Sequence, residues 1–314
     1  MDPKIQRLAP KPIVPGGQSS PSKRRNPPAD PSSAVSQVAT SMLTSIVHPD
    51  YFVHAHEERE LGRDTITPPS LASGGVPEPT RAYLERARGG GPEPTPQPKP
   101  LLVVLDLNGT LLYRPSASSN PRSFVKRPFA TEFLAYCIST FHVVVWSSAR
   151  PSNVASMLEQ LVGPELRRRI VAVWSRNRFG LTPQDYNARV MCYKRLSALW
   201  NCPDVAASYP APPGRGGRWD QGNTVLVDDS PEKARSEPYN AITIPAFLGG
   251  GEPERRAVLP LVHDYLNTLA CQVDVSRYMR MHPFRAEDVL DEFYTKSRQA
   301  RAKPRRQTLE AQPC

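Results

Sequence analysis

Three apolar runs that are typical of buried strands each end in a polar side chain. They are Leu101–Leu105 before Asp106, His142–Trp146 before Ser147, and Thr224–Val227 before Asp228 and Asp229. In an open parallel sheet the carboxyl ends of the strands meet at one edge, and ligands bind outside that edge. We therefore expect these polar side chains to lie close together.

A carboxylate at this edge can attack a phosphorus atom. Asp106 would then carry an aspartyl-phosphate, provided that a divalent cation offsets the repulsion between the two anions. Asp228 and Asp229 can bind that cation together with Asp106, and Mg²⁺ suits a site with few carboxylates and shared phosphate oxygens. The alternative for Asp228–Asp229 is an ordinary turn before a helix, with Ser230 as the cap.

Three further side chains are candidates for binding the phosphoryl group. Ser147 can donate a hydrogen bond to it, and Lys194 can neutralise its charge. Arg150, close behind Ser147, could contact a substrate phosphate or simply begin a helix. Lys194 could equally be a solvated residue on an amphipathic helix predicted over 186–200.

Short β-branched runs alternate with amphipathic segments between residues 100 and 295, which indicates βαβ units. Two more strands are expected at 170–174 and 241–244, and helices at 128–140 and 153–162. We predict a three-layer, Rossmann-like α/β domain with a five-stranded, mainly parallel sheet. Only 46 residues separate Ser147 from Lys194, which leaves no room for a large cap domain.

The composition differs at the two ends of the chain. The first 100 residues hold 18 of the 36 prolines and show little periodicity, so we expect residues 1–99 to form a mostly disordered arm, with short helices possible at 33–46 and 81–88. The tail 296–314 carries six basic residues against one acidic residue. Because much of the net charge of +10 lies there, the body does not suggest a dedicated nucleic-acid binder.

Five scattered cysteines without CxxC spacing indicate neither a disulfide framework nor a zinc site. No apolar run is long enough to suggest a membrane span, and no secretory signal is evident. We expect an intracellular protein of the nucleus or cytoplasm, with the mitochondrion as the alternative. The oligomeric state stays open.

Taken together, five motifs resemble the haloacid dehalogenase superfamily, in its CTD-phosphatase-like (NLI-interacting-factor-like) branch. They are DLNGTLL from Asp106, KRP from Lys126, VVVWSSA around Ser147, YKRLS around Lys194, and VLVDDSP around Asp228. The resemblance implies that Asp106 is the nucleophile, that Ser147 and Lys194 bind phosphate, and that Asp228 and Asp229 hold magnesium. It also implies a phosphoric monoester hydrolase. Without a large cap the site is open, which suits a side chain on a phosphorylated protein as the substrate.

Asn108 departs from the family pattern, which has a second aspartate there as general acid and base. The backbone carbonyl of Asn108 can still bind the metal, but its amide cannot donate a proton to the leaving oxygen. General acid catalysis typically contributes about 10²- to 10⁴-fold. We therefore expect a bias toward aryl and acyl phosphates, which leave without a proton, and a persistent aspartyl-phosphate. DLNG also resembles a known subgroup of the branch.

Two non-catalytic functions remain as alternatives. The family includes a phosphatase-like receptor subunit of the mitochondrial inner-membrane translocase, and the segment 238–245 is similar to that branch. A third interpretation is a phosphoprotein-binding scaffold whose proline-rich arm recruits partners. Retention of the full set of site residues favours catalysis, whereas Asn108 favours the alternatives.

Overall fold

The computed structural model describes residues 66–114, 124–211, 216–249 and 258–286. Its main sheet has five strands in the order β5-β4-β1-β6-β7, all parallel, as predicted. The strands are β1 (Leu102–Leu105), β4 (His142–Trp146), β5 (Ala172–Trp174), β6 (Thr224–Asp228) and β7 (Ala241–Thr243). Central β1 pairs on both sides, with Leu105 opposite Val145 and Val227. The ends of β1 and β6 are therefore neighbours at one edge.

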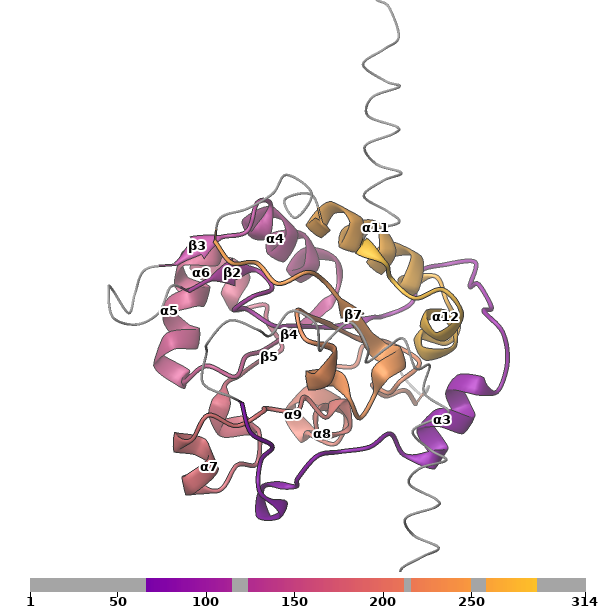
Figure 1. Ribbon diagram of the computed structural model, residues 1–314. Coiled ribbons are helices and arrows are strands. Elements are labelled where there is room, and N and C mark those ends of the chain that lie inside the picture. The colour runs from indigo at the N-terminus through magenta and orange to yellow at the C-terminus, as the bar shows by residue number, and fades with distance from the viewer. Residues whose placement is uncertain (1–65, 115–123, 212–215, 250–257, 287–314) are drawn as a thin grey trace, which may run out of the picture. The chain divides into compact units, whose positions relative to one another are not determined.

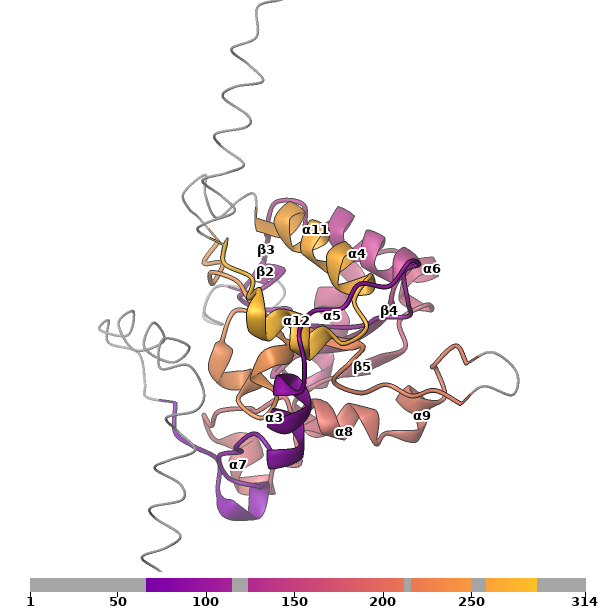
Figure 2. The ribbon, with the colours of Figure 1, turned by 90° about the vertical axis from the view of Figure 1, so that its right-hand side faces the viewer.

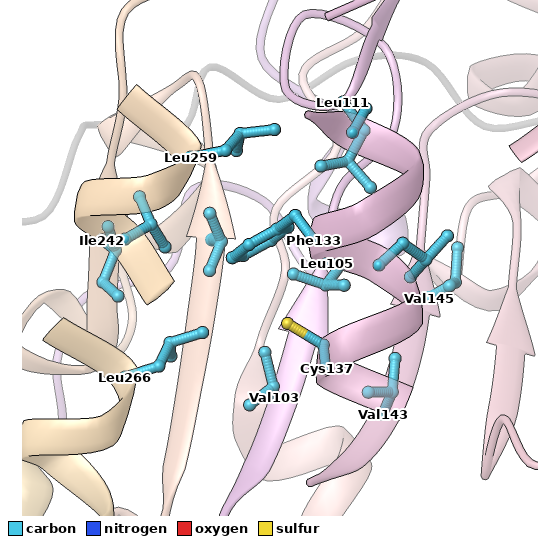
Figure 3. Packing of buried hydrophobic residues seen from close by; sticks show 14 of the residues in the cluster. Val103, Leu105, Leu111, Phe133, Cys137, Val143, Val145, Ile242, Leu259 and Leu266 are labelled. Carbon is cyan, nitrogen blue, oxygen red and sulfur yellow. The ribbon is translucent and has the colours of Figure 1, made fainter. Parts of the chain in front are cut away.

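Helices cover both faces of the sheet because successive side chains of a strand point to opposite faces (Figures 1 and 2). On one face Val103 and Leu105 pack beneath α4 (Ala130–Thr140), α5 (Pro151–Leu161) and α11 (Val258–Ala270). Figure 3 shows Phe133 of α4 and Leu266 of α11 in this cluster. On the other face Leu102 and Val104 pack with α8 (Leu196–Trp200) and α9 (Pro203–Ala206). The three-layer prediction is confirmed.

Shorter elements complete the described structure. They are α3 (Arg81–Arg88), α6 (Pro164–Arg167), α7 (Pro183–Asn187), α12 (Val275–Met281), the 3₁₀ turns η1 (Leu71–Ser73), η2 (Arg176–Arg178), η3 (Pro231–Ala234) and η4 (Pro238–Asn240), and the antiparallel pair β2 (Leu112–Tyr113) and β3 (Val125–Lys126). Within the described ranges, no helix is long and apolar enough to cross a membrane.

Residues 66–99, which we placed in the disordered arm, have defined structure and pack on the domain. The helix expected at 81–88 is α3, and it buries Tyr83, Leu84 and Ala87. The Tyr83 hydroxyl donates to Asn240 Oδ1 at 2.9 Å. The sequence boundary at residue 99 is thus too late, because these contacts join residues far apart in the chain. The possible helix at 33–46, the rest of the arm and the tail 296–314 lie outside the described residues.

The prediction of one continuous helix over 186–200 is wrong for the middle of that range. Helix α7 ends at Asn187, and α8 begins only at Leu196. Between them the chain is not helical, and residues 189–191 pair with Thr67, whose N–H donates to Arg189 O at 3.2 Å and whose carbonyl accepts from Met191 N at 2.9 Å. Lys194 therefore lies between the two helices, because a distant pairing partner competes with the local helical pattern.

From its sequence, the proline- and glycine-rich stretch 203–222 could either fold over the site entrance or form a plain surface loop. In its described part, Trp219 is buried and its ring centroid lies 5.1 Å from that of His142, the first residue of β4. Because His142 begins its strand, this part lies at the amino edge of the sheet. It does not cover the carboxyl edge.

Candidate active site

Three carboxylates meet at the carboxyl edge of β1 and β6. Asp106 follows β1, Asp228 ends β6 and Asp229 follows it, and one oxygen from each lies within 4.8 Å of the others. Asp106 and Asp228 are each only 1% exposed. The sheet register brings them together, because β1 and β6 are adjacent, parallel and aligned. The juxtaposition expected from the sequence is thus present.

Lys194 lies between two of these carboxylates. Its fully buried ammonium contacts Asp106 Oδ1 at 2.7 Å and Asp228 Oδ2 at 2.5 Å. Both hydrogen bonds are charge-assisted, because the donor is an ammonium and each acceptor is a carboxylate. Lys194 is therefore not the solvated residue of the alternative interpretation.

A second lysine, Lys233 of η3, joins the same group and was missed by our sequence reasoning. Its ammonium lies 2.8 Å from Asp228 Oδ1, 3.0 Å from Asp229 Oδ1 and 3.6 Å from Asp106 Oδ2. Its spacing of four residues from Asp229 was the available signal, since a turn after a strand can return such a side chain to the strand end. We call Asp106, Asp228, Asp229, Lys194 and Lys233 the strand-end cluster.

The two adjacent aspartates of the cluster differ in their pKa. Burial tends to raise the pKa of Asp228, but the two lysines outweigh it and hold the pKa below its usual range. Burial raises the pKa of Asp229 to about 6, with Lys233 opposing and Asp228 and Asp106 adding to the rise. Burial would lower the pKa of Lys233, yet the three carboxylates raise it well above its usual value. Asp228 and Lys233 are therefore charged at neutral pH.

The loop after Asp106 is shaped around Asp229. Gly109 has φ of +90°, and a Cβ there would lie 2.3 Å from Asp229 Oδ2. Only glycine fits this left-handed, crowded position without strain. The neighbouring Asn108 is exposed, and its side-chain oxygen accepts from the Arg114 N–H at 3.0 Å. The Asn108 side chain thus supports the chain at the end of β2.

The two other candidate phosphate ligands lie after β4. Ser147 is buried, and its hydroxyl oxygen accepts from the Ala149 N–H at 3.3 Å. Arg150 precedes α5 and points toward α7, where it donates to Asn187 Oδ1 at 3.1 Å and lies 5.7 Å from the Tyr186 ring centroid. The phosphate-binding role of both residues stays a prediction.

Arg127, the second residue of the KRP motif, has a structural role. It is 1% exposed and donates to the carbonyls of Gly109 at 2.9 Å and Pro245 at 2.6 Å. It therefore ties the loop after Asp106 to the segment after β7.

The donor set of the cluster fits Mg²⁺. Its carboxylate oxygens are the ligands that this hard cation prefers. Three carboxylates face two ammonium groups, which leaves one negative charge in excess. Gly109 leaves the space beside Asp229 Oδ2 that a side chain would fill. Asp228 binds a lysine on each oxygen, so Asp229 and Asp106 are the less engaged pair.

Comparison with known proteins gives a family for residues 101–277, which match the model of the NLI interacting factor-like phosphatases. An uncharacterised FCP1 homology domain-containing protein of Schizosaccharomyces pombe is 33% identical over 219 residues, covering 67% of this chain and 86% of the relative. A ubiquitin-like domain-containing CTD phosphatase of Arabidopsis thaliana is 24% identical over 192 residues. That match covers 60% of this chain and 52% of the relative, about half its length.

Solved structures also show similarity. The RNA polymerase II CTD phosphatase Fcp1 matches with 14% identity and a TM-score of 0.32, over 74% of this chain and 70% of that one. A D,D-heptose 1,7-bisphosphate phosphatase of B. bronchiseptica, complexed with magnesium and phosphate, matches with 17% identity and a TM-score of 0.32. It covers 52% of this chain and 99% of that one. At these TM-scores neither match bears on the function.

Proposed function

The chain belongs to the NLI interacting factor-like phosphatase family, and from this premise we propose that it is a magnesium-dependent phosphatase that acts on phosphorylated protein through an aspartyl-phosphate at Asp106. The observation that carries the proposal is the strand-end cluster, in which a buried carboxylate nucleophile lies beside a carboxylate pair and two ammonium groups. A binding module has no need for this costly burial of charge.

Asp106 Oδ2 is the nucleophilic oxygen in this proposal. Oδ1 accepts a 2.7 Å hydrogen bond from Lys194, whereas the contacts of Oδ2 are longer, 3.4 Å from the Thr110 hydroxyl and 3.6 Å from Lys233. Attack on phosphorus forms the aspartyl-phosphate and breaks the bond to the leaving oxygen. Water then hydrolyses the intermediate and regenerates the carboxylate.

Ser147 and Lys194 hold the transferring group, by a hydrogen bond and by charge respectively. Both are buried, so water competes little with either interaction. Bound Mg²⁺ would neutralise the negative charge that nucleophile and phosphate bring together. Asp106, Asp229 and the carbonyl of Asn108 would hold it, while Asp228 keeps the two lysines in place.

Asn108 limits the leaving groups. Its amide holds the hairpin through Arg114 and cannot supply a proton, so the leaving oxygen departs as an anion or takes a proton from water. Aryl phosphates tolerate this, whereas the alkoxide of a phosphoserine is a poor leaving group. The proposed protein substrate rests on the short connections around the site and on the name of the Arabidopsis relative, a CTD phosphatase.

Hydrolysis of an aryl phosphate by the purified full chain tests the proposal. The wild-type protein is expected to require Mg²⁺, and Asp106→Asn should lower the rate at least about 10³-fold because the nucleophile is lost. Asp220→Asn is the matched control, since it makes the same chemical change at the amino edge, where Asp220 binds Arg86. Rates that neither Mg²⁺ nor Asp106→Asn alters would instead favour the receptor-subunit and scaffold alternatives.

A further inference from the structure

Lys233 adds a positive charge to the site, and the proposed reaction gives that charge no role. Lys194 already lies between the nucleophile and Asp228, so a second, partly buried ammonium is not needed to hold either carboxylate. Burying an additional lysine is unfavourable unless strong contacts compensate. Lys233 makes such contacts with all three carboxylates of the cluster.

The backbone fixes the position of Lys233 relative to Lys194. The Lys194 N–H donates to the Lys233 carbonyl at 2.7 Å, and the hydroxyl of neighbouring Tyr193 donates to Glu232 Oε1 at 3.0 Å. The Lys194 segment is thus docked on η3. Neither of these bonds involves the Lys233 side chain, so shortening or neutralising that side chain leaves the docking in place.

The two ammonium groups bind opposite oxygens of one carboxylate. Lys194 binds Asp228 Oδ2, and Lys233 binds Asp228 Oδ1 at 2.8 Å. Lys233 also contacts Asp229 Oδ1 at 3.0 Å, whereas Lys194 contacts Asp106 and Asp228. Lys233 therefore adds positive charge beside the carboxylates that would bind the metal.

We propose that Lys233 sets the balance between cation and phosphate affinity in this site: it weakens Mg²⁺ binding and strengthens binding of the phosphoryl dianion. The inference rests on the proposed function and names a determinant of it. With Lys233 the cluster has a net charge of one negative unit, and with Mg²⁺ bound it becomes one positive unit. Without Lys233 these values are two negative units and zero.

The sign of each effect follows from Coulomb's law. An ammonium that contacts the ligand carboxylates repels a divalent cation bound to them and attracts a phosphate dianion that binds next to Asp106. Charges separated by a few ångströms in a partly buried site interact strongly enough to change an affinity about tenfold or more. A purely structural lysine would act differently, because its loss would lower the affinities for Mg²⁺ and for phosphate together.

Isothermal titration calorimetry on the full chain tests the proposal with two probes, Mg²⁺ alone and inorganic phosphate in saturating Mg²⁺. Lys233→Met keeps the length of the side chain and removes its charge. We expect it to bind Mg²⁺ about tenfold more tightly and phosphate about tenfold more weakly than wild type. Opposite shifts of the two affinities are the diagnostic result.

Lys126→Met is the matched control, because it removes one charge from an exposed position on β3. Both of its affinities should stay within about twofold of wild type, as expected for a screened surface charge. Lys233→Gln serves as the second variant if Lys233→Met does not fold, since its amide can still donate to Asp228 while carrying no charge. The same opposite shifts are expected for it.

Parallel losses of both affinities, or no change in either, would overturn the role of Lys233 while leaving the phosphatase intact. Failure of the wild-type chain to bind Mg²⁺ would instead overturn the proposed function itself, and the inference with it.

Discussion

Two charged clusters lie at opposite edges of the sheet, and they differ in how their charges are balanced. At the carboxyl edge, the strand-end cluster has three carboxylates for two lysines, and Asp106, Asp228 and Lys194 are almost fully buried. At the amino edge, Arg86, Lys99, Asp220 and Asp274 form a second group, which we call the clamp cluster. Its two carboxylates face two cations, and Arg86 is 37% exposed.

The charged groups of the clamp cluster are paired with one another or with nearby backbone carbonyls. Arg86 of α3 binds Asp220 through two nitrogens, at 2.7 and 3.1 Å, and Asp274 at 2.9 Å. Lys99 donates to the backbone carbonyls of Gly222 at 2.5 Å and Val273 at 2.7 Å. These contacts join the segment before β1 to the loop before β6 and to α12. Balanced, partly exposed charges thus hold chain segments together.

Ion pairs occur at both edges of the sheet, so they do not identify the candidate site. Burial combined with an unequal number of positive and negative charges does. Buried charge that its neighbours do not neutralise is unfavourable for folding and is expected where a ligand completes the balance. The strand-end cluster has this property, and the clamp cluster does not.

Asn108→Asp should give the largest effect, because it adds the missing general acid to the strand-end cluster. We expect hydrolysis of an alkyl phosphate to rise about 10²-fold or more, with a much smaller gain for an aryl phosphate. Rates with the two substrates check this, and mass spectrometry of quenched protein should show less phosphorylated Asp106 in the variant. An equal gain for both substrates would contradict the proposed effect of Asn108 on the leaving group.

Asp274→Ala should weaken the clamp cluster with little effect on catalysis. Asp274 accepts from the Arg277 N–H at the start of α12 and from Arg86, so its loss removes a helix cap and an ion pair. The free energy of unfolding should fall by about 2 kcal/mol in denaturant titrations. The rate of aryl-phosphate hydrolysis should stay within about twofold, and a large loss of rate would show that the two edges are coupled.

Lys99 should give the smallest effect, a pH dependence of stability. Burial lowers its pKa to about 8, with Asp274 and Asp220 opposing and Arg86 adding to the shift. Between pH 8 and about 10 the unfolded chain keeps the proton that folded Lys99 loses, so this group favours the folded state more as pH rises.

Comparison with Lys99→Met isolates the contribution of this group. The free energy of unfolding of wild type relative to Lys99→Met should rise by about 1 to 2 kcal/mol between pH 8 and pH 10. A constant difference between the two proteins would show that Lys99 keeps its ordinary pKa.

Local patterns of the sequence predicted the frame of the site. Buried parallel strands appear as continuous apolar runs, so β1, β4 and β6 could be located within a residue or two. Because parallel strands end at one edge, the positions of Asp106, Ser147 and Asp228 after those runs predicted their common edge. For Lys194, the sequence left phosphate binding and a solvated position open, and the resemblance to the family, whose membership the comparisons confirmed, favoured phosphate binding.

The tertiary structure alone decided which charges face one another. Lys233 and Asp106 are separated by more than a hundred residues, as are Arg86 and Asp274, and no local periodicity encodes such pairs. The break between α7 and α8, before Lys194, likewise depends on Thr67, which pairs with residues 189–191 and lies far away in the sequence. Apolar runs and strand ends are properties of a short segment, whereas charge balance depends on the distances between segments, which only the folded chain fixes.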